Sequence, residues 1–226
     1  MPDKEAQKKA LLDKLERSKY ITNQRIRKAM EIVPREAFIP EERCKNAYED
    51  HPLSIGYGQT ISAPHMNAMM CSGLDLDNLD SPIKLLEIGT GSGYHATLCA
   101  EILKQVQPGS KVYTVERIKD LADRARKIIN QLGYGETITV IHSDGTLGYS
   151  EAAPYDRILV TAAGPRVPEA LASQLTDNGG IMLIPLGGRR GFQRLVKVIK
   201  QEGKLKEKRV CGVAFVPLIG KDGFAE

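Results

Sequence analysis

The sequence has no tryptophan, few aromatic residues and no apolar run that approaches the length of a membrane span. Aromatic residues account for 5% of its 226 residues, whereas a transmembrane helix needs about 20 consecutive apolar positions. Residues 1–5 also lack the apolar core of a secretory signal. We therefore expect a cytoplasmic protein with no membrane partner, and its 42% of hydrophobic residues can fill the core of one or two domains.

The sequence also lacks a broad excess of positive charge. Its 32 basic and 28 acidic residues give a net charge of +4, and residues 1–32 account for all of it with nine basic and five acidic side chains. Because the remaining chain is electroneutral, a wide phosphate-binding surface is not indicated and no nucleic-acid partner is expected. We interpret the basic N-terminal segment as a solvated cover over the rest of the protein.

No two cysteines stand at the spacing of a metal or redox motif. The four cysteines are Cys44, Cys71, Cys99 and Cys211. Their separation provides neither a zinc knuckle nor a Cys-x-x-Cys pair, and the histidines at positions 51, 65, 95 and 142 are not paired at ligand spacing. The sequence therefore predicts buried, reduced thiols and no metal site.

The first third of the chain reads as helices followed by a turn-rich stretch. Apolar residues recur at near-helical spacing from residue 5 to 33, and Pro34 ends the second run. The stretch around residues 50–64 is rich in turn-forming residues. Residues 65–74 can again be helical, with Pro64 in the first turn.

From residue 84 onward, short apolar runs alternate with helical patterns. The expected strands are residues 84–89, 111–116, 138–142, 155–162 and 180–185, and the expected helices are 94–104, 119–132 and 168–175. Such alternation is typical of a parallel α/β sheet with right-handed crossovers. Residues 194–200 and 210–218 look like two further strands joined by a charged turn, which predicts a terminal antiparallel hairpin.

The expected fold is therefore a doubly wound, mostly parallel α/β sheet with an N-terminal helical segment and a C-terminal antiparallel hairpin. We divide it into residues 1–79, the helical segment with the turn-rich loop, and residues 80–226, the sheet domain. We expect the two parts to form one compact unit.

A glycine loop follows the first expected strand, where open α/β sheets bind ligands. Residues 91–96, Gly-Ser-Gly-Tyr-His-Ala, match the dinucleotide pattern G-x-G-x-x-A, and Glu116 ends the next strand where a ribose-binding acid would stand. The loop also reads as Glu87-x-Gly89-x-Gly91-x-Gly93, which resembles the first motif of Rossmann-like S-adenosylmethionine-dependent methyltransferases. The pattern of glycines alone leaves both ligands open.

The methyltransferase resemblance implies a role for two further acidic positions. In that superfamily the glycine loop cradles the amino-acid part of the cofactor, an acid ending the second strand binds the ribose, and an acid after the third strand faces the adenine. Glu116 and Asp144 occupy the two latter places here, and carboxylates accept hydrogen bonds from hydroxyl and amino groups. The alternatives are a solvated strand end for Glu116 and a turn former for Asp144, which precedes Gly145.

A more specific block follows the turn-rich stretch: residues 59–66 read Gln-Thr-Ile-Ser-Ala-Pro-His-Met. This block is similar to that of the protein-L-isoaspartate O-methyltransferase family. Further similar segments are residues 31–40, 47–48, 52–58, 87–93, 144–149, 153–156, 179–180 and 215–218. The resemblance covers roughly residues 20 to 220.

This resemblance implies an enzyme of protein repair that acts on isoaspartyl-containing proteins and peptides. It would transfer the methyl group of S-adenosylmethionine to the free α-carboxylate of an L-isoaspartyl residue and release S-adenosylhomocysteine. The ester then collapses without the enzyme to a succinimide, which hydrolyses partly to normal aspartate. We expect a monomer.

The resemblance also implies a set of site residues, with Ser62 as the catalytic residue. The implied cofactor contacts are Gln59, Thr60, Ile61, Ser62, His65, Glu87, Gly89, Thr90, Gly91, Ser92, Gly93, Glu116, Asp144, Gly145, Ile219 and Phe224. The implied substrate contacts are Ala63, His65, Val213 and Phe215, and the run of residues 213–218 could present an edge to which an extended peptide adds.

Simpler structural roles remain open for several of these residues. Ser62 could be a helix cap, His65 and His95 could lie on helix surfaces, and Val213 and Phe215 could pack in the core. Two other functions also remain open: a methyltransferase with an RNA or small-molecule acceptor, and a non-catalytic adaptor that binds through its basic N-terminal helix. Residues 160–165 lack the Asn/Asp-Pro-Pro-aromatic signature of amine methylation.

Overall fold

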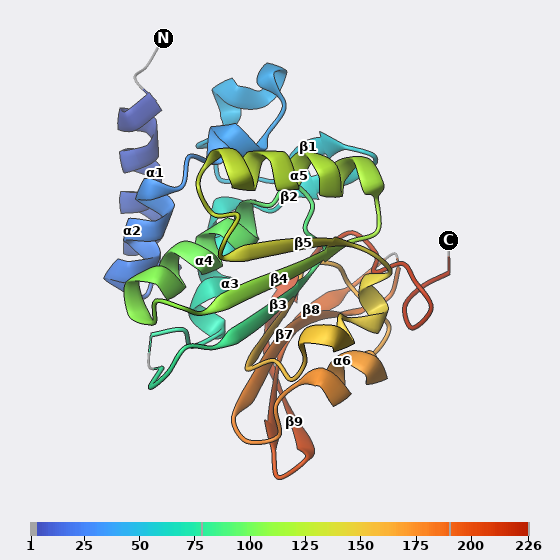
Figure 1. Ribbon diagram of the computed structural model, residues 1–226. Coiled ribbons are helices and arrows are strands. Elements are labelled where there is room, and N and C mark those ends of the chain that lie inside the picture. The colour runs from blue at the N-terminus through green and yellow to red at the C-terminus, as the bar shows by residue number, and fades with distance from the viewer. Residues whose placement is uncertain (1–3, 78, 190, 226) are drawn as a thin grey trace.

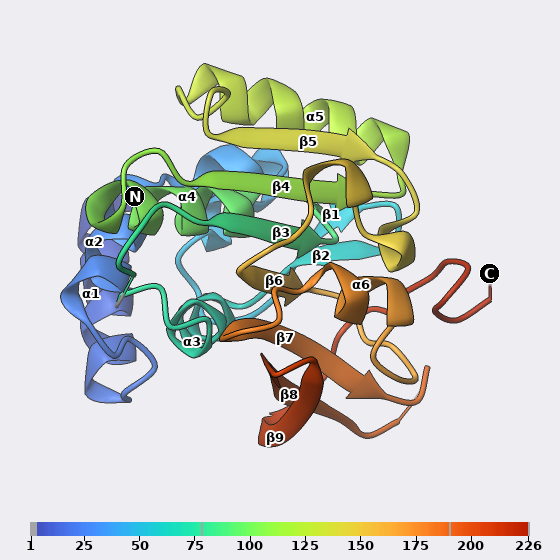
Figure 2. The same ribbon diagram turned by 60° about the horizontal axis from the view of Figure 1, so that its bottom comes forward.

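A seven-stranded sheet forms the centre of the protein, with helices packed on both of its faces (Figures 1 and 2). The computed structural model describes residues 4–77, 79–189 and 191–225. Of residues 1–5, which we expect to lack a secretory signal, the first three lie outside the described residues. The strands of the large sheet are β3 (Lys84–Ile88), β4 (Lys111–Glu116), β5 (Ile138–His142), β6 (Arg157–Val160), β7 (Gly180–Gly187), β8 (Gln193–Gln201) and β9 (Lys204–Val213). The helices are α1 (Lys4–Arg17), α2 (Gln24–Ile32), α3 (Pro64–Gly73), α4 (Tyr94–Val106), α5 (Lys119–Gln131) and α6 (Glu169–Gln174).

The strand order in the sheet is β5-β4-β3-β6-β7-β8-β9. The first five strands in this order run parallel, and β8 and β9 run antiparallel to their neighbours. Central strands such as β6 are buried at every position because helices cover both faces. Helices α4 and α5 share one hydrophobic cluster and α6 belongs to a second one on the opposite face. The predicted fold class is confirmed.

The C-terminal hairpin is shifted from its expected position. The expected antiparallel hairpin is confirmed, but the prediction of a strand over residues 210–218 is wrong after Val213, because β9 is Lys204–Val213 and pairs with β8 over that range. Strand β9 lies at the sheet edge and is exposed along most of its length, so no apolar run marks it. After Val213 the chain crosses to the loop behind β6, where Ala163 exchanges hydrogen bonds with Val216 and Leu218.

The turn-rich stretch contains a small hairpin that its composition did not predict. Strands β1 (Leu53–Gly56) and β2 (Gln59–Ile61) pair antiparallel, with Leu53 opposite Ile61. Both residues are buried and anchor the hairpin on the core. The hairpin therefore fixes the chain directly before Ser62. Helix α3 begins at Pro64, as expected.

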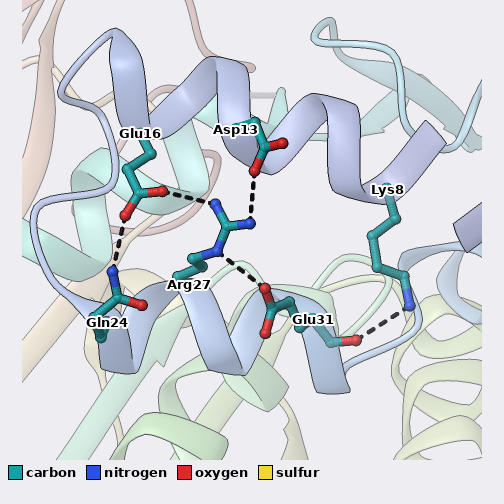
Figure 3. Close-up of polar contacts among 6 residues, drawn as sticks. All are labelled: Lys8, Asp13, Glu16, Gln24, Arg27 and Glu31. Atoms are coloured by element: carbon teal, nitrogen blue, oxygen red, sulfur yellow. Dashed lines mark hydrogen bonds and ion pairs between the residues drawn. The ribbon is translucent and has the colours of Figure 1, made fainter. Parts of the chain in front are cut away.

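The two N-terminal helices are joined by a half-buried arginine, Arg27 (Figure 3). The Arg27 guanidinium donates to Asp13 at 2.7 Å, to Glu16 at 2.8 Å and to Glu31 at 3.0 Å, so one side chain of α2 holds two acids of α1 and one of its own helix. Lys8 adds a bond from α1 to the carbonyl oxygen of Glu31.

The described part of the chain holds no helix with the length and apolarity of a membrane span.

Candidate active site

The glycine loop lies at the carboxyl end of β3 and begins α4. In Figure 2 the arrowheads of β3, β4 and β5 point toward the side of the molecule where the C-terminal segment lies. Gly89 has a φ of +93°, and a Cβ there would lie 2.4 Å from the Thr161 hydroxyl oxygen, so only glycine fits. Gly93 is packed against Ala125 and Ile129 of α5. Gly93 therefore shapes the start of α4, and the pockets described below are lined by its neighbours.

Glu87 lies beneath this loop with no solvent exposure. Its Oε2 accepts a hydrogen bond from Thr114 at 2.6 Å, and Thr114 is in turn bonded to Thr90 of the loop. Its Oε1 has no hydrogen-bond partner among the described residues. Burial raises the pKa of Glu87 to about 7, although nearby His95 and the bond from Thr114 lower it. A hydrogen-bond donor that binds Oε1 would therefore strongly stabilise the ionised form of this carboxylate.

Glu116 holds the glycine loop against β4. One carboxylate oxygen accepts the backbone N–H of Gly91 at 2.9 Å and the other accepts that of Ile118 at 3.0 Å. The side chain is buried yet lines a pocket, which excludes the solvated strand end as its structural role. Each oxygen retains a second lone pair for a hydroxyl donor.

Asp144 is bonded on both oxygens to the protein itself. Oδ1 accepts from the backbone N–H and the hydroxyl of Thr146, and Oδ2 accepts from the backbone N–H of Lys221 at 2.8 Å. Burial raises its pKa, but the bonds from Lys221 and Thr146 outweigh this effect, and the net shift is downward. The C-terminal segment is thus tied to this acid, so Asp144 is more than a turn former.

Four pockets line up along the carboxyl edge of the sheet. The central pocket is lined by Gln59, Thr60, Ile88, Gly89, Gly91, Val115, Glu116, Arg117, Gly145, Thr161, Ala162, Val216, Pro217, Leu218 and Ile219. The tail pocket is lined by Arg117, His142, Ser143, Asp144, Ile219, Gly220, Phe224 and Ala225. The inner pocket is lined by Thr60, Ile61, Ser62, Asn67, Glu87, Gly89, Thr90, Gly91, Ser92, Tyr94, His95 and Thr161.

The outer pocket contains all of the expected substrate contacts. It is lined by Pro52, Thr60, Ser62, Ala63, His65, Met66, Thr161, Gly212, Val213, Ala214, Phe215 and Val216. Ser62 lines both the inner and the outer pocket, and Thr60 and Thr161 line these two and the central pocket. The pockets therefore meet around Ser62. Val213 and Phe215 also pack against the core, so their two expected roles coincide.

Ser62 is not the cap of α3. Ala63 occupies the N-cap position and makes no side-chain cap bond, so the alternative of a helix cap for Ser62 is wrong. A buried guanidinium holds Ser62 by its main chain: Arg35 donates to the Ser62 carbonyl oxygen at 2.7 Å. Arg35 also donates to the Ala47 carbonyl and to Asn67. Its side chain is 1% exposed, and burial lowers its pKa.

His65 is oriented by an acid from the preceding loop. Asp50 Oδ1 accepts from the His65 backbone N–H at 3.0 Å and lies 2.8 Å from Nδ1 of its ring. The second oxygen of Asp50 is 3.8 Å from the Lys14 ammonium of α1. A proton on Nδ1 leaves Nε2 as the acceptor or second donor of this ring. His65 is therefore held in one orientation in the outer pocket. The alternative of a helix-surface position for His95 is wrong, because this side chain is buried.

The edge expected for peptide addition is largely occupied. Gln193 binds both the N–H and the carbonyl of Phe215, and Ala163 binds Val216 and Leu218. The prediction of an open edge over residues 213–218 is therefore wrong for these three positions, because side-chain and loop contacts replace a strand partner there.

Four residues of the site were not expected from the sequence. They are Arg35, Asp50, Asn67 and Thr161. Thr161 donates to the Gly89 carbonyl at 2.8 Å and directly follows β6, so its place after a parallel strand was an available signal. Arg35, Asp50 and Asn67 act across many residues of sequence, and no local spacing indicates their contacts.

The arrangement as a whole defines a class of enzyme. An acid precedes the glycine loop, a second acid ends β4 and a third follows β5, all around connected pockets at one edge of the sheet. These features are those of a Rossmann-like, S-adenosylmethionine-dependent methyltransferase. A model of the protein-L-isoaspartate(D-aspartate) O-methyltransferase family matches residues 6–223, and the chain belongs to this family.

Relatives and solved structures agree with this assignment. The protein-L-isoaspartate O-methyltransferase of Ignicoccus hospitalis is 50% identical over 96% of this chain and 100% of its own length. That of Methanothermobacter thermautotrophicus is 50% identical over 94% of each chain. A putative protein-L-isoaspartate O-methyltransferase from Plasmodium falciparum, solved with S-adenosyl-L-homocysteine, has a TM-score of 0.79 at 28% identity and covers 93% of this chain and 97% of its own.

The family assignment settles the cofactor. The enzyme uses S-adenosylmethionine, so the dinucleotide interpretation of the glycine loop and the non-catalytic adaptor are both set aside. All four cysteines are free, and the prediction of buried thiols is confirmed for Cys71 and Cys99, whereas Cys44 and Cys211 are only partly buried.

Proposed function

We propose that this repair methyltransferase modifies the α-carboxylate of L-isoaspartyl residues where the inner and outer pockets meet. The observation that carries the proposal is the position of Ser62, which lines both pockets. A methyl donor bound at the glycine loop and an acceptor bound beside Val213 and Phe215 would come together at this residue. Such positioning can lower a barrier by about 7–11 kcal/mol.

The inner pocket suits the amino-acid end of the cofactor. Glu87 Oε1 is buried without a partner among the described residues, and an ammonium group would neutralise and satisfy it. Glu116 and Asp144 stand where donors of the ribose and adenine would reach them. When bound, S-adenosylmethionine supplies an electrophilic methyl carbon with a neutral thioether as leaving group.

The acceptor needs orientation more than activation. A carboxyl group with an ordinary pKa near 3.9 is ionised at pH 7 and is already a nucleophile. The Ser62 hydroxyl can donate to one carboxylate oxygen and leave the other facing the donor. The buried charge of Arg35, which touches the carbonyl of the same residue, makes this position favourable for an anion.

His65 extends this environment toward the outer pocket. Because Asp50 accepts from its Nδ1, the ring is held in one orientation beside Ala63 and Ser62. Val213 and Phe215 supply apolar contact on the opposite side of the pocket. This combination suits a substrate that carries its carboxylate on a peptide of variable sequence.

We further propose that the protein acts in the cytoplasm as a monomer, with residues 1–79 and 80–226 folded as one unit. The free cysteines suit a reducing compartment. One hydrophobic cluster contains residues from both parts, such as Leu15 and Leu98, which favours a single unit. Light scattering on the purified chain would test the monomer, and a stable dimer would contradict it.

One assay tests the assignment. The enzyme is incubated with S-adenosylmethionine carrying a labelled methyl group and with two peptides that differ only in Asp versus L-isoAsp. We expect label in the isoaspartyl peptide alone. Label in neither peptide, or equal label in both, would contradict the proposal. As a control for cofactor choice, S-adenosylhomocysteine and not NAD should raise the melting temperature.

A further inference from the structure

Two cysteines and a histidine that are distant in the sequence meet in the core between α3 and α4. Cys71 lies in α3, and His95 and Cys99 lie one turn apart in α4. One ligand atom from each, either sulfur or ring nitrogen, falls within 4.8 Å of the other two. The three side chains are 2%, 6% and 0% exposed. Cys71 and Cys99 lie outside the pockets that the proposed methyl transfer uses, whereas His95 also lines the inner pocket.

We propose that Cys71, His95 and Cys99 form a binding site for one soft divalent cation of the Zn²⁺ type. Zinc bonds of about 2.3 Å to sulfur and about 2.0–2.1 Å to nitrogen, at tetrahedral angles, require sulfur and nitrogen about 3.6 Å apart. The Cys71 sulfur lies 3.5 Å from His95 Nε2. This pair therefore already stands at the separation that an ion requires, and the Cys99 sulfur lies within 4.8 Å of both atoms.

The charges of the cluster favour this occupant. Two thiolates and a neutral imidazole around a divalent ion give a net charge of zero, which is the least costly state for a buried group. Thiolate and imidazole ligands select zinc-like ions over magnesium or calcium.

The far side of the histidine adds a second observation. His95 Nδ1 is buried without a hydrogen-bond partner among the described residues, and Glu87 Oε1 is in the same condition. Both side chains line the inner pocket. Metal-bound histidines usually donate their second N–H to a carboxylate, and an oxygen of Glu87 has two lone pairs, so it can serve both His95 and a cofactor ammonium. The inner pocket also offers a path for the ion.

A bound ion would join the two halves of the active site. Helix α3 begins directly after Ser62 and Ala63, and α4 begins directly after the glycine loop. An ion bridging Cys71 with His95 and Cys99 would fix the distance between these helices. The expected result is higher thermal stability of the loaded protein.

The test is metal binding by the whole chain. Protein reduced with a phosphine and freed of metal by a chelator is titrated with Cd²⁺ and Co²⁺, and thiolate-to-metal charge transfer is followed by absorption. Zn²⁺ affinity is then measured by competition with a chromophoric chelator. We expect one ion per chain, and a loss of at least about 100-fold in affinity in Cys71→Ser and Cys99→Ser.

Matched controls come from the other two cysteines. Cys44→Ser and Cys211→Ser should bind as the wild type does, because these thiols lie outside the cluster. If a core variant does not fold, alkylation mapping of the wild type replaces it: Zn²⁺ should slow modification of Cys71 and Cys99 and leave Cys44 unaffected. Absence of a charge-transfer band, or equal affinity in Cys71→Ser and Cys44→Ser, would overturn the proposal. Methyl transfer by metal-free protein is assayed separately, so failure of either proposal is recognised on its own.

Discussion

At the scale of single residues, the candidate site depends on groups that bind the main chain around Ser62. Arg35 binds the carbonyl of Ser62, and Asp50 binds the backbone N–H of His65. Both contacts leave the side-chain hydroxyl of Ser62 and Nε2 of His65 for a ligand. A substitution of the Ser62 side chain can therefore change ligand binding while the shape of the loop is kept.

Ser62→Ala should lower the rate of methyl transfer by an order of magnitude or more, which corresponds to about 1.4 kcal/mol of transition-state stabilisation. Because Ala63 and not Ser62 caps α3, the melting temperature should change little. Steady-state kinetics and calorimetry with S-adenosylhomocysteine measure both effects. Ser54→Ala, an exposed serine of β1, is the control. Unchanged turnover in Ser62→Ala would contradict the role of its hydroxyl.

The raised pKa of Glu87 predicts pH-dependent cofactor binding. Below its pKa of about 7 the carboxyl group is protonated and neutral, so a cofactor ammonium has to displace a proton. Affinity for S-adenosylhomocysteine should therefore rise by up to about tenfold for each pH unit between about pH 6 and pH 7, and level off above. In Glu87→Gln, weaker binding with a flat pH dependence is expected by calorimetry. Parallel curves for the two proteins would contradict this.

Much of the cofactor site could be predicted from the sequence because its residues stand at fixed places along strands. Glu87, Glu116 and Asp144 each stand at or just after the end of a strand. The alternation of strands and helices along the sequence is enough to predict that these strand ends meet at one edge of the sheet. Arg35 and Asp50 could not be predicted in this way. Their partners are 27 and 15 residues away, and only the packing of the N-terminal segment brings them into contact.

At the scale of elements, the C-terminal segment lines the central and tail pockets. The sequence misplaces it because β9 is a charged edge strand and the apolar run after it is a crossing loop. Ile219 and Phe224 pair as an isolated bridge within this segment, and both line the tail pocket. The contact of Lys221 with Asp144 then fixes the segment on the body of the protein.

Gly220→Ala should disturb this contact. A Cβ at position 220 would lie 2.1 Å from the Asp144 carboxylate, so the segment has to move away. We expect about tenfold weaker binding of S-adenosylhomocysteine, which corresponds to about 1.4 kcal/mol of binding free energy. Gly191→Ala is a matched control, since Gly191 also has positive φ but nothing lies within 4 Å of its Cβ position. Equal affinities in the two variants would contradict the prediction.

Arg27→Met should loosen the pair of N-terminal helices. It removes two charge-assisted hydrogen bonds between α1 and α2, to Asp13 and Glu16, and a third within α2, to Glu31 (Figure 3). We expect a loss of about 1–2 kcal/mol in unfolding free energy at low salt and a smaller loss at high salt, measured by urea denaturation. Arg25→Met, whose ion pair with Asp77 is 3.9 Å long and partly exposed, should cost less. An equal loss in both variants would argue against the network.

At the scale of the whole molecule, part of the positive charge of the N-terminal segment is paired with acidic side chains of the protein. Arg27 is surrounded by acids, Lys8 pairs with Glu5 and Lys14 lies near Asp50. Beneath these pairs, the apolar side of α1 belongs to the main hydrophobic cluster. The segment thus stabilises the fold through the apolar side of α1.

Deleting residues 1–17 should therefore affect stability more than chemistry. The deletion exposes the contact surface of Leu11, Leu12 and Leu15, each worth about 1.5–3 kcal/mol when buried. We expect a fall of more than about 10 °C in melting temperature with near-normal affinity for S-adenosylhomocysteine at low temperature. A shorter deletion of residues 1–7 keeps the three leucines and serves as control. Loss of activity at unchanged stability would contradict the prediction.

The bond from Arg35 to the Ser62 carbonyl has a consequence for how such an enzyme can diverge. A carbonyl oxygen belongs to the backbone, so this anchor is available to whatever amino acid occupies position 62. Mutation at this position can change the chemistry presented between the inner and outer pockets while the loop keeps its course. Variants at position 62 with new acceptor preferences can therefore arise in evolution, or be selected from a mutant library, without loss of the loop conformation.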